Sequence, residues 1–177
     1  MGAPPPDAPG PARRLALALA VAAVVVAADQ GTKQWALSYL AHRSAIALPG
    51  NWISLRLITN PGAAFSVGSG STWIFTLFAT AVVLIVPWFA ARARAQVMTL
   101  GLLLGGAAGN LADRLFRAPG PGTGRVVDFI DYHGWFIGNV ADIAIVVSAG
   151  LLLLRALRSP GHKQPVPDQT PTACPGP

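Results

Sequence analysis

The sequence contains no glutamate and a single cysteine in 177 residues, and charged residues make up only 11% of it. Soluble domains usually carry about a quarter charged residues, so this deficit favours a membrane protein. The lone thiol, Cys174, excludes a disulfide within the chain, and Cys/His spacings typical of zinc sites are absent. The 13 Lys and Arg residues are scattered without forming a basic helix face, so no nucleic-acid partner is expected.

Four long apolar stretches predict four membrane-spanning helices. They run from about Leu15 to Leu40, Thr72 to Ala90, Val97 to Ala112 and Phe136 to Leu154. Crossing the hydrocarbon region takes roughly 17–25 residues, which the first and third stretches reach only by extending through Asp29 and Asp113. A cleaved signal peptide is the alternative for the first stretch, because arginines precede it. Its direct continuation into polar residues ending at Lys33 favours a retained helix.

Basic residues near the predicted helix ends indicate the orientation of the chain. They precede the first stretch, separate the second from the third and follow the fourth, which places these ends in the cytoplasm. Both termini are therefore expected inside. Residues 1–12 and 159–177 are rich in Pro and small residues and are predicted to be disordered cytoplasmic tails. Residues 13–158 form the predicted membrane domain.

Two segments are predicted to lie outside the membrane. Within residues 42–67, the stretch Trp52–Ile58 alternates in part between apolar and polar residues and is flanked by Pro, Gly and Asn turn signals. This pattern predicts a small extracytoplasmic β element on the membrane surface. Residues 117–125, rich in Gly and Pro, predict an outer loop between the third and fourth helices.

All seven acids are aspartates, and most of them fall at one predicted depth. Placing an acid near lipid costs several kcal/mol unless it is paired or hydrated, so such a group indicates a functional site. Asp131 is expected to be exposed to solvent in the segment before the fourth helix. The five aspartates predicted at the outer level are Asp29, Asp113, Asp128, Asp131 and Asp142.

Local spacing offers partners to two of these five acids. Asp29 lies four residues before Lys33, and a helix brings such positions together. Asp113 can pair with its neighbour Arg114 or, at the same i+4 spacing, with Arg117. Structural roles are therefore sufficient to explain Asp29 and Asp113.

Asp128 and Asp142 are harder to explain by structural roles, and no basic residue lies within one helical turn of Asp142. Asp128 lies among apolar neighbours, and Asp142 is predicted one to two turns inside the fourth helix with Asn139 on the same face. Two adjacent carboxylates cannot both ionise easily and share one proton. The ionised member can activate water and the protonated member can assist the leaving group, which suits peptide hydrolysis.

Other chemistries fit the sequence less well. No Gly-x-Ser-x-Gly or His-Glu-x-x-His motif is present, and His133 is expected in an exposed loop. A proton or cation pathway predicts acids near the bilayer midplane or inverted repeats, and neither is visible. A purely structural membrane subunit is a third alternative. The glycines of the segment 105–109 indicate close helix packing.

Four motifs occur in order along the chain. They are Asp29-Gln30-Gly31-Thr32-Lys33; Asn60-Pro61-Gly62-Ala63-Ala64-Phe65; Gly105-Gly106-Ala107-Ala108-Gly109-Asn110-Leu111-Ala112-Asp113-Arg114; and Val126-Val127-Asp128-Phe129-Ile130 followed by Asn139-Val140-Ala141-Asp142. Their order and spacing resemble those of the lipoprotein signal peptidase family, the type II signal peptidases of bacteria. The resemblance covers about residues 13–158.

This resemblance implies an all-α membrane protein with four transmembrane helices, an extracytoplasmic β-cradle and a periplasmic loop, in the bacterial inner membrane. It implies an aspartic endopeptidase that cleaves diacylglyceryl-modified prolipoproteins just before the lipidated cysteine, at the extracytoplasmic face. Asp128 and Asp142 match the catalytic pair, with Asp113 as the second choice. The expected partners are the lipid-modified substrate and membrane lipid, the protein is expected to be a monomer, and no cofactor or metal is expected. Positions that match residues supporting the site or the substrate are Asp29, Lys33, Asn60, Gly62, Asn110, Asp113, Arg114, Asn139 and Ala141.

Two positions depart from the family pattern. Gly138 precedes Asn139 where the family often has Phe, and Ile143 follows Asp142 where it often has Ser. The loop between the two aspartates is also short. These differences concern the shape and rim of the pocket more than the aspartate pair.

Overall fold

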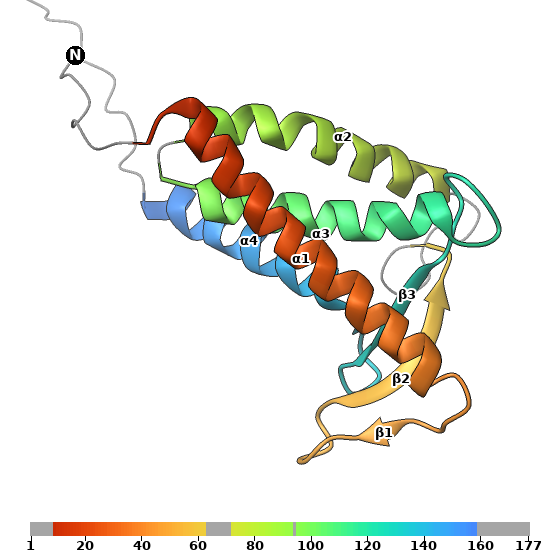
Figure 1. Cartoon of the computed structure of the whole chain (residues 1–177). Helices are drawn as coiled ribbons and strands as arrows, with labels where there is room; N and C mark the ends of the chain where they lie inside the picture. The colour runs from red at the N-terminus through yellow and green to blue at the C-terminus, as the bar shows by residue number, and fades with distance from the viewer. Residues whose placement is uncertain (1–8, 63–71, 94, 159–177) are drawn as a thin grey trace, which may run out of the picture.

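The computed structural model describes residues 9–62, 72–93 and 95–158, and this part of the chain folds into four helices and a small sheet (Figure 1). The helices are α1 (Pro11–Tyr39), α2 (Thr72–Arg92), α3 (Val97–Phe116) and α4 (Val140–Arg158). The four apolar stretches therefore correspond to four helices. The predicted start of the fourth at Phe136 is wrong, because residues 137–138 belong to a strand. The predicted tails lie largely outside the described residues.

The sheet is antiparallel and has the order β1-β2-β3-β4. Its strands are β1 (Ile46–Ala47), β2 (Ser54–Asn60), β3 (Val126–Asp131) and β4 (Ile137–Gly138). The predicted outer β element corresponds to β1 and β2, whereas β3 and β4 were not predicted. β3 is buried along nearly its whole length, so it lacks the alternation that marks a half-exposed strand. The residues of β3 nonetheless complete the sheet by pairing with β2.

Helix α3 lies at the centre of the helical layer and packs against α1, α2 and α4. Two of its glycines allow α1 to approach closely. A Cβ on Gly101 would lie 2.8 Å from Cβ of Val21, and a Cβ on Gly105 would lie 2.6 Å from Cβ of Val25. Both separations are too short for any larger side chain. The prediction that the glycines of the segment 105–109 serve packing is therefore confirmed at Gly105.

Three of the helices, α1, α2 and α4, are long and apolar enough to cross a membrane. Helix α3 carries more glycine than the other three helices, and its position between them shields much of its surface from lipid. Large apolar side chains such as Leu84 and Val146 remain 72% and 68% exposed on the helices. The fold is thus that of a mostly helical membrane protein with a small antiparallel sheet.

The sheet lies at one end of the helical layer (Figure 1). Helix α1 ends beside it and α4 begins beside it, whereas the start of α1 and the end of α4 lie together at the opposite end (Figure 1). The aspartates of α1, α3, β3 and α4 that the sequence placed at one level therefore meet where helices and sheet join.

Candidate functional site

A cavity of about 380 Å³ opens at the junction of helices and sheet, and two aspartates line it. Asp128 comes from β3 and Asp142 from the start of α4. The rest of the wall is mostly apolar and is formed by side chains of α2, α3 and α4 such as Phe78, Leu103 and Ile145. We call Asp128 and Asp142 the aspartate pair.

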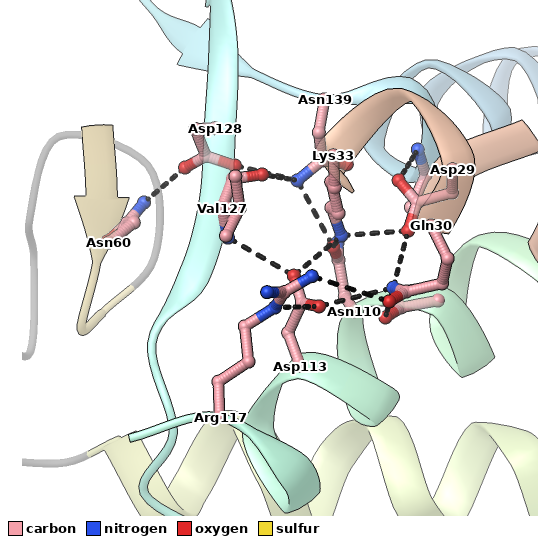
Figure 2. A network of polar contacts seen from close by, with 12 residues as sticks. Asp29, Gln30, Lys33, Asn60, Asn110, Asp113, Arg117, Val127, Asp128 and Asn139 are labelled. Atoms are coloured by element: carbon pink, nitrogen blue, oxygen red, sulfur yellow. Dashed lines mark hydrogen bonds and ion pairs between the residues drawn. The ribbon is translucent and has the colours of Figure 1, made fainter. Parts of the chain in front are cut away.

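Asp128 is 2% exposed and accepts hydrogen bonds from two asparagine side chains (Figure 2). Asn60 Nδ2 lies 3.0 Å from Oδ2 of Asp128, and Asn139 Nδ2 lies 2.6 Å from Oδ1. The orientation of each amide is set by a backbone donor, since Gly62 N–H donates to Asn60 Oδ1 and Asp142 N–H donates to Asn139 Oδ1. Both amides must therefore present N–H groups to Asp128.

Asp142 occupies the first turn of α4, closer to the helix start than predicted. It forms a capping box with Asn139: the backbone N–H of Asn139 donates to Asp142 Oδ2 at 3.1 Å, and the N–H of Asp142 donates back to Asn139 Oδ1 at 3.0 Å. Asn110 Nδ2 donates to the other oxygen of Asp142 at 2.8 Å. Asn139 thus contacts both members of the aspartate pair.

The surroundings of Asp128 favour its protonated form. Burial, followed by the negative charge of Asp142, raises the pKa of Asp128 from 3.8 to about 6, although the amides of Asn60 and Asn139 oppose the shift. Neither member of the pair forms an ion pair with a basic side chain in the described part of the chain. Asp128 therefore binds a proton more tightly than a free aspartate, partly because of the negative charge of Asp142.

Lys33 joins two further carboxylates, those of Asp29 and Asp113 (Figure 2). Its Nζ lies 2.8 Å from Oδ2 of Asp29 and 2.8 Å from Oδ2 of Asp113, and all three side chains are fully buried. The same ammonium donates to Asn110 Oδ1 at 3.0 Å. The predicted pairing of Asp29 with Lys33 is confirmed, and the contact between α1 and α3 adds Asp113.

The two carboxylates bound to Lys33 each accept a backbone N–H next to the aspartate pair. Asp113 Oδ2 accepts from Val127 at 3.1 Å, the residue immediately before the aspartate on β3. Asp29 Oδ1 accepts from Ala141 at 3.0 Å, the residue immediately before the aspartate on α4. The positions of both members of the pair are therefore tied to the same buried ammonium.

The partner of Asp113 left open by the sequence is Arg117, whose Nε donates to Oδ1 at 2.6 Å. Arg114 instead lines the cavity and donates through one terminal nitrogen to the carbonyl of Gly62 at 2.9 Å. Gln30 was not predicted as a site residue, yet its amide donates to Asp113 Oδ1 at 3.1 Å. Only its place beside Asp29 in the first motif could have indicated it.

The prediction that Asp131 is exposed is wrong. The residue is 6% exposed, and its carboxylate pairs with Arg56 at 3.2 Å and accepts the backbone N–H of Gly134 at 2.7 Å. It is buried because it belongs to β3 rather than to a free segment. Asp131 does not line the cavity of the aspartate pair. His133 is exposed on the following turn and contacts the carbonyl of Asn51 at 3.0 Å.

The fold and the site define a helical membrane protein with one buried and one partly buried carboxyl group, Asp128 and Asp142, in one largely apolar cavity. The family model described as signal peptidase (SPase) II, peptidase family A8, matches residues 21–158, and the chain belongs to this family. Members of the family are peptidases that process lipoproteins.

Curated relatives agree with this assignment. The chain is 44% identical over 158 residues to the lipoprotein signal peptidase of Mycobacterium tuberculosis (strain ATCC 25618 / H37Rv), a match that covers 88% of this chain and 78% of the relative. It is 48% identical over 150 residues to that of Leifsonia xyli subsp. xyli, with 83% and 69% covered.

A solved bacterial membrane enzyme has the same fold. It superposes with a TM-score of 0.70 at 24% sequence identity, covering 84% of this chain and 92% of that chain. A second solved structure of a bacterial membrane enzyme superposes with a TM-score of 0.68, also at 24% sequence identity. At this level of identity the likeness concerns the fold alone.

Proposed function

We propose that this protein removes the signal peptide from diacylglyceryl-modified prolipoproteins by hydrolysing the peptide bond just before the lipidated cysteine. The observation that carries the proposal is the aspartate pair: two carboxyl groups that line one apolar cavity at the end of a helical membrane domain. The names of the relatives support a lipoprotein as the substrate. The apolar wall suits a substrate that carries acyl chains.

The reaction that suits this geometry is general acid–base hydrolysis by the aspartate pair. The ionised carboxylate takes a proton from water, whose oxygen then attacks the carbonyl carbon of the scissile bond. The protonated partner donates a hydrogen bond to the carbonyl oxygen and its proton finally reaches the leaving nitrogen. The raised pKa of Asp128, about 6, supports its retaining a proton at mildly acidic pH, as the acid member of such a pair must.

The neighbouring polar residues act as supports in this proposal. Asn60 and Asn139 orient Asp128, and Asn110 orients Asp142. Asp29 accepts the backbone N–H of Ala141, and Asp113 accepts that of Val127, so each carboxylate holds the residue just before one member of the pair. Lys33 lies between these two carboxylates. Arg114 fixes the carbonyl of Gly62 and borders the space where substrate backbone would lie.

The proposed membrane placement has all four helices crossing the bilayer, with both termini in the cytoplasm and the sheet at the outer face. Helix α3 can cross despite its lower hydropathy because α1, α2 and α4 surround it. Apolar cavity residues from α2 and α4, among them Phe78 and Val146, allow a lipidated substrate to enter from the bilayer. The proposal requires no second copy of the chain, no cofactor and no metal.

The test is cleavage of a diacylglyceryl-modified prolipoprotein by the purified protein in lipid–detergent micelles. Asp128→Asn and Asp142→Asn should each abolish cleavage, while both variants still show a cooperative thermal unfolding transition. Asp131→Asn is the matched control, because it removes a buried carboxylate from the same strand but outside the cavity, and it should retain cleavage. Normal turnover by either of the first two variants would refute the assignment. An inactive Asp113→Asn beside active variants of the pair would transfer the role to Asp113.

A further inference from the structure

A second hollow, of about 560 Å³, lies on the opposite face of β2 and β3 from the aspartate pair. Thr59 and Val127 are opposite each other in the strand register and line this hollow, whereas Asn60 and Asp128 line the cavity on the other face. The lining residues outside the sheet are Leu37 of α1 and, between α3 and β3, Arg117, Ala118, Pro119 and Arg125.

The hollow has a positive rim. Arg117 uses its Nε for Asp113, whose charge is also balanced by Lys33, and one terminal nitrogen donates to Gln30 Oε1 at 3.5 Å. Arg125 is exposed, and its guanidinium makes no hydrogen bond or ion pair with any residue that the structure describes. Its backbone N–H donates to the carbonyl of Ala118 at 3.1 Å, which keeps it beside Arg117. No acid is among the lining residues, and the carboxylate that contacts Arg117, that of Asp113, is buried and also paired with Lys33.

The depth of the hollow is indicated by aromatic side chains on α1. Along α1, Leu37 falls between Trp35 and Tyr39 in the sequence. The rings of Trp35 and Tyr39 stack at 5.4 Å between centroids and remain 42% and 43% exposed. Arg43 covers the ring of Tyr39 at 4.2 Å. Trp and Tyr rings gather at the membrane–water interface, where lipid headgroups lie. The hollow is therefore at headgroup depth beside the outer end of α1.

We propose that this hollow binds the phosphate of an anionic phospholipid of the outer leaflet. Guanidinium groups match phosphate oxygens in planar, bidentate geometry, and Arg117 and Arg125 border the space. The hydroxyl of Thr59 adds a donor, and Leu37 offers an apolar surface to the start of an acyl chain. This apolar surface favours a lipid over free inorganic phosphate. The proposal uses the membrane placement given above but not the peptidase reaction.

The test is the unfolding temperature of the full chain in phosphatidylcholine nanodiscs that contain increasing fractions of phosphatidylglycerol. A ligand that binds the folded state raises this temperature saturably, so the wild-type protein should show a plateau. In Arg125→Gln the fraction of phosphatidylglycerol needed for half of the effect should rise roughly tenfold, as expected for one lost charge-assisted hydrogen bond.

Arg56→Gln is the matched control. It makes the same charge change on β2, and its side chain is 48% exposed outside the hollow, so its response to phosphatidylglycerol should equal that of the wild type. Equal responses of Arg125→Gln and the wild type would overturn the proposal, as would equal losses in both variants. Stabilisation by inorganic phosphate at the same concentration would assign the site to a free anion and overturn the lipid assignment. The measurement involves no cleavage, so its failure would leave the proposed peptidase reaction unaffected.

Discussion

Replacing Lys33 by methionine tests how strongly one buried ammonium holds the site together. Methionine preserves most of the length and the apolar stem of the side chain, and it removes the positive charge. In the intact protein that charge lies 2.8 Å from each of two fully buried carboxylates, Asp29 and Asp113, and 3.0 Å from Asn110 Oδ1. After the substitution Asp113 keeps Arg117, whereas Asp29 keeps only neutral hydrogen-bond donors.

Breaking a buried ion pair from one side costs about 3–5 kcal/mol, because the remaining charge stays buried without compensation. For a chain of this size, 1 kcal/mol corresponds to about 2–4 °C in the unfolding temperature. We therefore expect Lys33→Met to lower the unfolding temperature by roughly 6–20 °C at neutral pH. Adding Asp29→Asn to Lys33→Met should recover part of the loss, because it removes the carboxylate charge that Lys33 no longer compensates.

Thermal unfolding in detergent at neutral pH, followed by tryptophan fluorescence, measures this effect. Arg56→Met is the control, because it breaks an ion pair whose arginine is 48% exposed and which should contribute at most about 1 kcal/mol. The reasoning would be refuted if Lys33→Met unfolded at the wild-type temperature, or if it lost no more than Arg56→Met. A loss that Asp29→Asn did not reduce would indicate a packing defect instead of uncompensated charge.

Two further predictions concern other parts of the site. A Cβ on Gly109 would lie 2.6 Å from Oδ2 of Asp29, so Gly109→Ala should destabilise the protein by about 1–3 kcal/mol and slow cleavage. The control is Gly150→Ala, where a Cβ would meet no atom within 4 Å, and it should be neutral or stabilising in the same thermal assay. Asp128 binds its proton more tightly in the folded state, with a pKa of about 6 against 3.8, so its contribution to stability is present at low pH and is lost as pH rises through about 6. The wild-type protein should lose about 2 kcal/mol relative to Asp128→Asn between pH 4 and pH 7, and parallel pH profiles of the two proteins would contradict the shift.

Features that depend on local spacing were predictable from the sequence. The apolar runs located the helices to within a few residues over most of their length, because lipid-facing helices need continuous apolar surface. The contact between Asp29 and Lys33 follows from i+4 spacing on one helix and is present at 2.8 Å. The close approach of α1 to α3 followed from a cluster of small residues that includes Gly105.

Features that depend on contacts between distant segments were not predictable in the same way. Strand β3 was missed because it is buried on both faces and carries no alternating pattern. The second partner of Lys33, Asp113, comes from another helix, and no local spacing relates the two residues. The hydrogen bonds from Val127 and Ala141 involve backbone N–H groups, which every residue other than proline carries, so residue type gives no indication of them.

The spacing between Asn139 and Asp142 shows how a correct pairing can be inferred from an incorrect geometry. The sequence placed both residues on one face inside a helix, where positions three apart are neighbours. In the structure the helix begins only at Val140, and the same spacing forms a capping box at its first turn. This geometry fixes the side chain of Asn139 through its Oδ1, so that its Nδ2 points to Asp128. The start of α4 therefore links the two carboxyl groups, which a helix continuing upstream of Asn139 would not do, because its N–H groups would bond within the helix.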